Sequence, residues 1–411
     1  MVIHFGDAKP NTRVVIVGAG FGGMACARAL RRSPAHDVTL VDRNAYHLFS
    51  PLLYQVATAS LPEDDIAFPV RTAHREVRFI RSEVERVDRA AKTLVLAGGR
   101  TLAYDDLVFA VGSEGTTFGI PGVQEHTLQM KSIHEARRIR SSLLRAYEQV
   151  EDGLMPPESL DVVIVGGGPT GVELAGAVRE LQGEIRREFE HIAPRATVTL
   201  LEAGPRILPS FHPRSSEHAR HTLEKMGVAV RTDASVVEAT ARSLRLASGE
   251  MLVAGTRIWA AGVVAPPHWR MLGDADRANR LRVDAHLRLD ESTWVVGDVA
   301  SVPGPGDRPL PMIAPVAIQQ GRYVARSIVR RGQGRALEPF RYRDKGQMAT
   351  IGRRKAVVEV RPWLRFHGTI AWLTWLALHL AYLSGGRNRT SIFADWVWNY
   401  LVWTPRRTIA D

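Results

Sequence analysis

The 411-residue chain contains a single cysteine, Cys26. One thiol cannot form an intramolecular disulfide, a CxxC redox pair or the four ligands of an iron–sulfur cluster. Any electron transfer by this chain would therefore require an organic cofactor. Cys26 lies in the apolar, helix-like run GGMACARAL, so we expect it to pack in the core.

Other features are also absent from the sequence. No apolar signal segment precedes the first strand-like run near Arg13, which predicts a cytoplasmic chain. No cluster of His, Asp and Glu has metal-ligand spacing, and we expect no metal. No arginine-rich tract with interleaved aromatics occurs outside the tail, which argues against nucleic acid. The net charge of +11 instead indicates acidic lipid or phosphate-bearing cofactors, or simply an arginine-rich, solubilising surface.

The first strand-like run leads into a glycine-rich turn. Residues 13–30, RVVIVGAGFGGMACARAL, combine a β-branched run, the glycines Gly18, Gly20 and Gly23, and a helix-like pattern. These glycines allow the backbone to approach a pyrophosphate closely, and the helix N-terminus supplies unpaired N–H groups. Asp42, in the later run DVTLVDRN, can accept hydrogen bonds from ribose hydroxyls. The pattern predicts a dinucleotide site.

The same pattern occurs a second time. Residues 160–181, LDVVIVGGGPTGVELAGAVREL, carry Gly166, Gly168 and Gly171, and a following strand-like run ends in Glu202. Two such folds predict two bound dinucleotides, although the second copy is also compatible with a degenerate duplicate that serves only as scaffold.

Glu202 indicates which dinucleotide binds at the second turn. A carboxylate facing the adenosine ribose favours a free 2′-hydroxyl and repels a 2′-phosphate, so we expect a preference for NADH over NADPH. Arg206 lies close in sequence and would soften that preference. The spacing from Gly166 to Glu202 is longer than usual, and residues 183–196, GEIRREFEHIAPRA, predict an extended, solvent-facing helix that fills the difference.

A third motif leads back to the first site. Residues 292–300, STWVVGDVA, place Asp298 at a strand end, where its carboxylate can bind the ribityl hydroxyls of a flavin. Residues 105–113 and 257–264 each put a glycine at a strand end, where the chain must pass close to a cofactor. By this motif, and by exclusion, the first site is predicted to hold FAD.

The order of these motifs resembles the flavoprotein oxidoreductases with two dinucleotide-binding domains, over residues 13 to about 330. Four further segments resemble one branch of them, the type II NADH dehydrogenases, which are non-proton-pumping NADH:quinone oxidoreductases. These segments are residues 44–61 (NAYHLFSPLLYQVATASL), 166–178 (GGGPTGVELAGAV), 314–325 (APVAIQQGRYVA) and 342–357 (YRDKGQMATIGRRKAV). Sulfide:quinone oxidoreductases and disulfide reductases share the scaffold but need paired cysteines, which this chain lacks.

The resemblance implies an α/β fold with two Rossmann-like domains. The FAD domain is discontinuous, over residues 12–125 and 280–340, and the NADH domain, residues 158–275, is inserted into it. Residues 341–411 would form a C-terminal region with a strand segment and amphipathic, membrane-anchoring helices.

The resemblance also implies an activity. A hydride would pass from NADH to FAD, and two electrons would then reduce a membrane quinone, without proton pumping. The protein would be a homodimer bound peripherally at the cytoplasmic side of the cell membrane. Two other functions remain open: a soluble NADH-dependent flavoprotein reductase of a protein acceptor, and a flavin-bound NADH-sensing interaction protein.

The predicted cofactor-binding residues lie on these motifs and strand ends. They are Gly18, Gly20, Phe21, Gly22, Gly23, Asp42, Arg43, Val84, Gly112, Asp298, Ala317, Ile318, Gly166, Gly168, Pro169, Thr170, Gly171, Glu202 and Gly262.

The predicted quinone residues are Gln319 and Gln320, amides in a helix that begins near Pro315 and would point its positive end at the flavin. The family pattern has Gln where this chain has Pro315, so Gln319 is the better candidate; both are otherwise solvent-facing helix residues. Glu173 would orient the nicotinamide or assist proton movement to the quinone, or simply suit a helix N-terminus. Lys345 would stabilise an anion near the flavin or quinone, or be an exposed strand lysine.

The tail is rich in aromatic residues. Six of the nine tryptophans lie in the last 49 residues. The apolar segment 368–383 is shorter than the roughly 20 residues that span a bilayer, and a second segment, 391–403, follows Arg387 and Arg389. Indole rings favour the headgroup boundary and arginines meet lipid phosphates. We expect two interfacial helices on the membrane; a buried dimerisation hairpin and a short true span are the alternatives.

Overall fold

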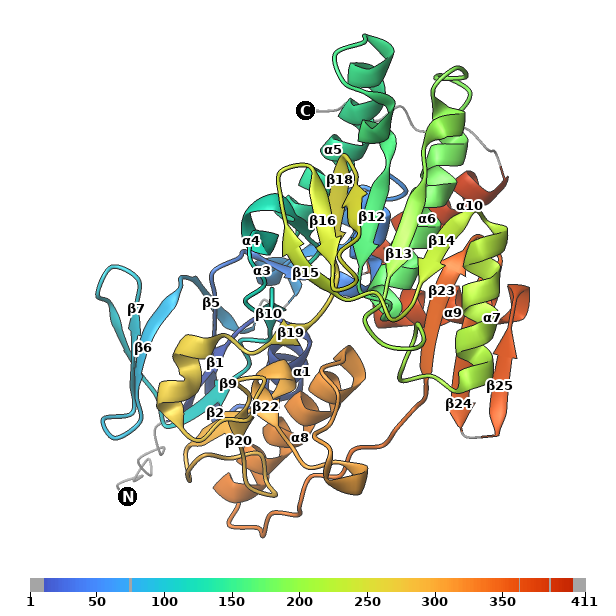
Figure 1. Cartoon of the computed structure of the whole chain (residues 1–411). Helices are drawn as coiled ribbons and strands as arrows, with labels where there is room; N and C mark the ends of the chain where they lie inside the picture. The colour runs from blue at the N-terminus through green and yellow to red at the C-terminus, as the bar shows by residue number, and fades with distance from the viewer. Residues whose placement is uncertain (1–10, 74–75, 362, 384–385, 402–411) are drawn as a thin grey trace, which may run out of the picture. The chain divides into compact units, whose positions relative to one another are not determined.

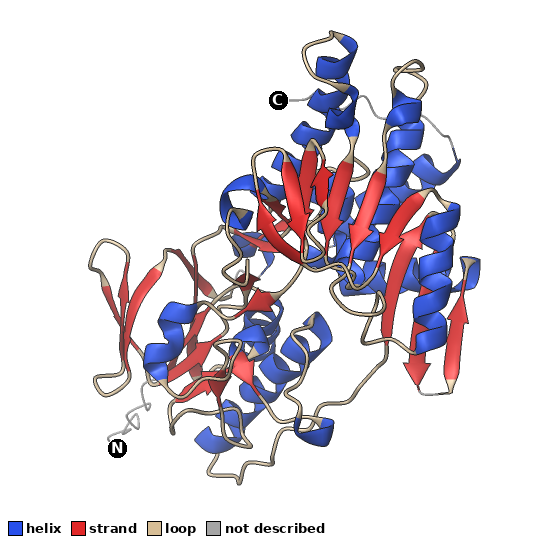
Figure 2. Ribbon diagram, viewed as in Figure 1, coloured by secondary structure: helices blue, strands red, loops and turns tan. Residues whose placement is uncertain are grey.

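The computed structural model describes residues 11–73, 76–361, 363–383 and 386–401. The chain divides into two compact units, each built from separate stretches of sequence (Figures 1 and 2). Unit 1 contains the chain up to Leu48, Phe68–Glu114 and Val263–Asp344. Unit 2 contains Phe49–Ala67, Gly115–Gly262 and the chain from Lys345 onward.

Unit 1 is built on a parallel five-stranded sheet with the order β21-β9-β1-β2-β5. Its strands are β1 (Thr12–Val17), β2 (His36–Asp42), β5 (Arg78–Arg81), β9 (Asp106–Phe109) and β21 (Thr293–Val295). Apolar β-branched residues fill the central strands because a parallel sheet is buried on both faces. Helices α1 (Phe21–Leu30) and α8 (Ala314–Gly332) pack side by side (Figure 1).

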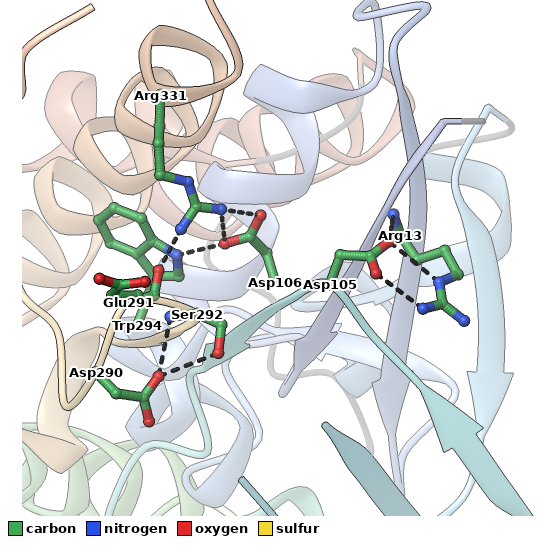
Figure 3. A network of polar contacts seen from close by, with 8 residues as sticks. All are labelled: Arg13, Asp105, Asp106, Asp290, Glu291, Ser292, Trp294 and Arg331. Atoms are coloured by element: carbon green, nitrogen blue, oxygen red, sulfur yellow. Dashed lines mark hydrogen bonds and ion pairs between the residues drawn. The ribbon is translucent and has the colours of Figure 1, made fainter. Parts of the chain in front are cut away.

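Two adjacent acids, Asp105 and Asp106, show how β9 is held in this sheet (Figure 3). Asp106 is fully buried, accepts a hydrogen bond from Trp294 Nε1 at 2.9 Å, and forms an ion pair with Arg331 at the end of α8. Asp105, just before the strand, pairs with Arg13 at 2.8 Å on the surface. The Asp106 network therefore ties α8 to the sheet from within the core, whereas the Asp105 pair is screened by water.

Unit 2 repeats this plan with a second parallel sheet of order β11-β18-β12-β13-β14. Its strands are β11 (Leu128–Gln129), β12 (Val162–Val165), β13 (Val198–Leu201), β14 (Val228–Arg231) and β18 (Thr256–Trp259). Its helices are α2 (Leu53–Ala57), α4 (Val123–His126), α5 (Ile133–Glu151), α6 (Pro169–Ile185) and α7 (Pro213–Lys225).

Each unit also carries an antiparallel three-stranded meander. In the chain it follows the edge strand of the parallel sheet (β5 or β14) and precedes an inner strand of the same sheet (β9 or β18). In unit 1 it is β6 (Val84–Asp88), β7 (Thr93–Leu96) and β8 (Thr101–Ala103); in unit 2 it is β15 (Val236–Ala239), β16 (Ser243–Leu246) and β17 (Met251–Val253). The glycine turn that occurs twice in the sequence is thus part of a larger repeat: each unit has a parallel five-stranded sheet and an antiparallel meander.

The C-terminal part of unit 2 is an antiparallel sheet followed by two helices (orange to red in Figure 1). Its elements are β23 (Gln347–Gly352), β24 (Lys355–Arg361), β25 (Leu364–His367), α9 (Thr369–Tyr382) and α10 (Gly386–Leu401). Helix α6 packs on β23 and α9 on β24. Within the described residues, no helix is both long enough and apolar enough to cross a bilayer.

The predicted fold class is confirmed, since two parallel α/β sheets and C-terminal helices are present. The extended helix expected over residues 183–196 is wrong. Helix α6 ends at Ile185, and the chain then turns. Phe189 and Ile192 thereby pack against the buried Tyr147 of α5, which a straight, solvent-facing helix would not allow.

Candidate functional site

The glycine turn of unit 1 has a geometry that only glycine allows. Gly18 has φ of +103°, and a Cβ there would lie 2.2 Å from the carbonyl oxygen of Ala110. A Cβ on Gly23 would lie 1.9 Å from the oxygen of Gly18. At Gly20, the N-cap of α1, an added Cβ would meet nothing within 4 Å. The turn thus exposes a helix N-terminus with open space before it, which suits a pyrophosphate.

Asp42, at the end of β2, supports this turn through the backbone. Its carboxylate accepts hydrogen bonds from Ala19 N at 2.6 Å and from Asn44 N at 2.7 Å. Burial raises its pKa, and these two bonds oppose that shift. The buried His47, whose ring nitrogen lies 2.7 Å from the oxygen of Ala19, holds the same segment from the other side.

The residues predicted to meet the ribityl chain and the ring of the flavin lie at and near the N-terminus of α8. Asp298 accepts a hydrogen bond from Ser113 Oγ at 2.5 Å, and Gly297 has φ of +79°. Helix α8 begins after Ile313 without a side-chain cap, so its first N–H groups have no such partner. Ala317 and Ile318 lie in the first turns of this helix, with Ala317 buried. These groups form a neutral-to-positive helix end that can stabilise a reduced flavin.

The remaining unit 1 candidates differ in their surroundings. Gly112 follows β9 and has φ of +74°. Phe21, the first residue of α1, packs its ring edge-on against His47. A Cβ on Gly22 would lie 3.1 Å from Val296. Arg43 is exposed just after β2, and Val84 is buried at the start of β6.

The glycine turn of unit 2 has the same geometry. Gly166 has φ of +114°, and a Cβ on Gly171 would lie 1.8 Å from the oxygen of Gly166. Gly168 is the N-cap of α6 and leaves open space, while Pro169 and Thr170 are exposed in the first turn. Proline suits this position because its missing N–H would have no helical partner.

Glu202 supports the second turn as Asp42 supports the first. It accepts hydrogen bonds from Gly167 N and Gly204 N, both at 2.7 Å. Nearby Arg206 donates to the oxygen of Pro209 at 2.8 Å. Its Nη1 is buried with no hydrogen-bond partner among the described residues. A carboxylate and a guanidinium therefore both lie next to the expected ribose position.

Gly262 lies three residues after β18, under an aromatic ring. A Cβ on Gly262 would lie 2.2 Å from Phe118 Cζ. Phe118 itself is 63% exposed and has φ of +53°. Only glycine allows the ring to approach the backbone here.

Glu173 lies in the first turns of α6 and faces the C-terminal sheet. Its Oε1 accepts a hydrogen bond from Thr350 N, on β23, at 3.3 Å. Burial of the carboxyl raises its pKa to about 8, although this bond and the indole of Trp375 favour the charged form. At neutral pH this shift favours the protonated form of the carboxyl.

The two glutamines are engaged within unit 1. Gln320 is 1% exposed, and its Oε1 accepts a hydrogen bond from Gly297 N at 2.6 Å. Gln319 is paired at both ends of its amide with the backbone of Arg343, at 2.9 and 3.0 Å. The amide nitrogen of Gln319 has a second N–H, so it can donate to a quinone oxygen while both of these bonds are kept. Lys345, in unit 2, is exposed and lies 3.3 Å from the hydroxyl of Tyr382 on α9.

A polar chain that the sequence did not reveal connects α2 to α10. Trp396 Nε1 donates to Gln55 Oε1 at 3.1 Å, and Gln55 Nε2 donates to the hydroxyl of Tyr54 at 2.8 Å. No local sequence pattern links residues 54 and 55 to residue 396, so this connection has no signal in the sequence. An amide beside an aromatic in an apolar run was the only indication that the pair is buried with polar partners.

No group of three or more His, Cys, Asp or Glu within the described stretches is arranged to hold a metal ion.

Comparison with known proteins places this geometry in a family. The pyridine nucleotide-disulphide oxidoreductase family matches residues 12–321, and the NDH2 C-terminal domain matches residues 345–403. The type II NADH:quinone oxidoreductase Ndh of Mycobacterium tuberculosis is 36% identical, over 95% of this chain and 88% of the relative. The type II NADH:quinone oxidoreductase of Staphylococcus haemolyticus is 29% identical, over 84% and 89%.

Solved structures share the fold. NDH2 from Plasmodium falciparum in complex with NADH has a TM-score of 0.88 at 20% identity, and the match covers 96% of this chain and 99% of that one. The sulfide:quinone oxidoreductase of Aquifex aeolicus has a TM-score of 0.75 at 19% identity, covering 96% of both chains. The family predicted from the sequence is confirmed: the chain belongs to the type II NADH:quinone oxidoreductases, within the pyridine nucleotide-disulphide oxidoreductase family.

Proposed function

We propose that this protein oxidises NADH and reduces a membrane quinone through bound FAD, without pumping protons. The observation that carries the proposal is the pair of glycine turns, each opening a helix N-terminus and each held by a carboxylate. FAD, when bound, accepts a hydride from the nicotinamide and releases the electrons to the quinone. The protein's residues bind the dinucleotides, orient them and supply protons.

FAD is assigned to the turn of unit 1, with the FAD domain over residues 12–125 and 280–340. The N–H groups of α1 would bind the pyrophosphate, and Asp42 would set the turn and meet the ribose. Asp298 would bind the ribityl chain, and the N-terminus of α8 would stabilise negative charge at the flavin pyrimidine. The open space at Gly20 and the uncapped start of α8 support this fit.

NADH is assigned to the turn of unit 2, over residues 158–275. Glu202 already faces the turn with its carboxylate, and a 2′-phosphate placed there would meet like charge. NADH is therefore preferred over NADPH as the hydride donor. Arg206 opposes this preference more weakly, because its positive charge would attract a 2′-phosphate. Gly262 would let the cofactor pass close to the backbone.

The quinone is assigned to the surroundings of Glu173. A carboxyl that keeps its proton at neutral pH can donate it to a reduced quinone oxygen. Gln319, Gln320 and Lys345 remain proposed contacts. Gln320 is the weakest of the three, because its side chain is almost fully buried.

The membrane is assigned to an apolar stripe on α9 and α10. Ile370, Leu373 and Leu378 follow helical spacing on α9 and are 38–70% exposed, and Phe393 and Trp398 extend the exposed apolar surface on α10. The opposite side of α9 is buried through Trp372 and Trp375, so both sides of the helix are apolar. An exposed apolar stripe of this kind suits peripheral binding at the lipid surface. We further propose the cytoplasmic side of the cell membrane and a homodimer.

Steady-state assays of the purified protein test the activity. NADH with a short-chain ubiquinone or with menadione should give rapid quinone-dependent oxidation, and the preparation should show a flavin spectrum. Turnover only with an added protein acceptor would favour a soluble reductase. Negligible turnover with every acceptor would favour an NADH sensor.

Two charged substitutions test membrane binding. Leu373→Glu and Trp398→Glu should release the protein from vesicles of anionic lipid while leaving NADH:ferricyanide activity unchanged, because neither side chain lies in the core. Met271→Glu is the matched control, since Met271 is 70% exposed in unit 1. Equal release by the control variant would show that the stripe has no special role.

A further inference from the structure

Trp375 is held rigidly in an aromatic cluster of unit 2. It is 1% exposed, and its ring stacks on His379 with centroids 3.9 Å apart. The ring of Tyr54 meets it at 6.4 Å and that of Trp396 at 6.1 Å. With neighbours on several sides, the indole cannot turn to point its N–H elsewhere.

The indole N–H of Trp375 is buried without a hydrogen-bond partner in the described part of the chain. It lies close enough to the carboxyl of Glu173 to act as a weak donor that favours the charged form of that group. No described acceptor, Glu173 included, meets both the distance and the angle of a full hydrogen bond to this N–H. A buried, unpaired donor is costly, and native proteins rarely keep one without a reason.

The other tryptophan of the same cluster shows that this is not a general feature of the packing. Trp396 is also buried, at 4% exposure, and its N–H is fully used by Gln55. The polar chain through Gln55 reaches the hydroxyl of Tyr54, whereas the N–H of Trp375 has no hydrogen-bond partner among the described residues. The cluster therefore satisfies one indole donor and leaves the other one available beside an acid.

We propose that the Nε1–H of Trp375 donates a hydrogen bond to a carbonyl oxygen of the quinone, beside Glu173. This inference rests on the proposed quinone reductase activity and names a binding residue for it. Helix α9 then serves the acceptor site as well as the membrane surface, because the helix with the exposed stripe also carries the donor. A quinone oxygen is an acceptor without charge, which suits a donor in an apolar, aromatic surround.

Helix α9 carries both the exposed apolar stripe and the buried donor. Ile370 and Leu373 are exposed, whereas Trp375 is buried. The packed side of the helix contacts β24, whose sheet also presents Thr350 N to Glu173. The acid and the indole N–H are therefore held by separate elements of unit 2 that pack together.

Two variants of the full-length, flavin-loaded protein distinguish the loss of the N–H donor from the loss of the indole ring's bulk. Trp375→Phe and Trp375→His both shrink the side chain, but only histidine keeps a ring N–H. With a short-chain ubiquinone, and separately with menadione, KM for the quinone should rise roughly tenfold in W375F and clearly less in W375H. The KM for NADH and the NADH:ferricyanide rate should stay unchanged in both.

Trp372→Phe is the matched control, since it makes the same change one turn earlier on α9, where the ring packs against Ala356 and Val358. It should leave the quinone KM unchanged. Equal quinone KM values for W375F and wild type, or equal rises in W375F, W375H and W372F, would overturn the proposal. If wild type itself reduces neither quinone, the proposed function fails, which is a distinct result.

A measurement on the wild-type protein covers the case in which W375F does not retain its flavin. Ultraviolet resonance Raman spectra report whether indole N–H groups are hydrogen-bonded. Saturating menadione should convert one indole from the free to the bonded signature. An unchanged indole spectrum with bound quinone would contradict the assignment.

Discussion

The two glycine turns are nearly identical in geometry, and each follows the same run, VVIVG, with its glycines at the same spacing. A Cβ on the third glycine would lie 1.9 Å from Gly18 in unit 1 and 1.8 Å from Gly166 in unit 2. The backbone N–H after each of these first glycines donates to a carboxylate, Asp42 at 2.6 Å or Glu202 at 2.7 Å. Both turns must expose the same N–H groups to a pyrophosphate, and that requirement fixes both structures.

The helices that follow the turns differ, because each has a different neighbour. Helix α1 approaches α8 so closely that a Cβ on Gly321 would lie 2.1 Å from the oxygen of Gly22. Helix α6 instead approaches β23, where a Cβ on Gly176 would lie 1.7 Å from the oxygen of Ile351. Seven residues after the first glycine, unit 1 has Ala25 and unit 2 has Glu173.

The two units therefore share the structure of the glycine turn, while the helix after each turn is adapted to a different neighbour. Helix α1 packs against α8, which is proposed to face the flavin, whereas α6 places Glu173 against the C-terminal sheet. A repeated dinucleotide fold can thus acquire a new site without any change in its phosphate-binding turn.

Alanine at the third glycine of each turn should have the largest effect, and the effects should differ in kind. In Gly23→Ala the new methyl would collide with Gly18, so the protein should purify without flavin and lose all activity. In Gly171→Ala the protein should keep its flavin spectrum and lose NADH oxidation by at least a hundredfold. Absorbance spectra and NADH:ferricyanide rates measure both.

Gly183→Ala is the control for this pair. Gly183 lies in α6, and a Cβ there would meet nothing within 4 Å. This variant should keep both activities and gain up to about 1 kcal/mol of stability from helix propensity. Loss of flavin in G171A would mean that the two turns are not independent.

Alanine at the two helix contacts should have the next largest effect. Gly321→Ala would separate α1 from α8, and Gly176→Ala would separate α6 from β23. Each overpacked contact should lower the free energy of unfolding by about 1–3 kcal/mol or more. Of the two, only G176A should also raise the KM for quinone, because it moves Glu173. Denaturant unfolding and quinone kinetics would show equal effects if the helices were not specialised.

The repeated turns could be predicted from the sequence, but the helix contacts could not. The glycines of each turn follow a fixed spacing after a β-branched strand, so local sequence determines them. Gly176 and Gly321 lie inside helices with no such spacing, and their necessity depends on a distant partner. The same holds for Asp106, whose buried pairing with Arg331 joins residues 225 positions apart.

The predicted acceptor residues show the same limit. Glu173 was selected from its position after the turn, but its hydrogen bond to Thr350 comes from a strand that no local pattern connects to it. Gln320 looked similar to Gln319 in sequence, yet one is bonded to Gly297 and the other to Arg343. Helix α10 begins at Gly386, five residues before the predicted segment 391–403. The prediction missed this first turn because its residues are polar and the segment was chosen by its apolar pattern.

Glu173 has no counterpart in unit 1 and should make stability depend on pH. Its pKa is about 8 in the folded protein, against an ordinary value of 4.5. The folded state therefore holds a proton that the unfolded state loses, and its stabilising effect is lost as pH rises through 8. His379, whose burial lowers its pKa to about 4, acts in the opposite sense below pH 6.5.

A window from pH 6.5 to 8 therefore isolates Glu173. Over this range wild type should lose about 1 kcal/mol of unfolding free energy relative to Glu173→Gln, as an order of magnitude for a partly exposed residue. Denaturant unfolding at several pH values measures the difference. Parallel pH curves for the two proteins would show that the carboxyl is not protonated at neutral pH.

The smallest effect is expected at the carboxylates that support the turns, and it should again separate the units. Glu202→Gln removes the charge that would meet a 2′-phosphate but keeps one acceptor for the backbone. Repulsion between screened charges is about 1 kcal/mol, so the ratio of kcat/KM for NADPH to that for NADH should rise roughly fivefold. Asp42→Asn makes the same chemical change in unit 1 and should leave that ratio unaltered, because it faces the other dinucleotide. An equal rise in both variants would mean that Glu202 acts through overall charge, and the assignment of one dinucleotide to each turn would lose its support.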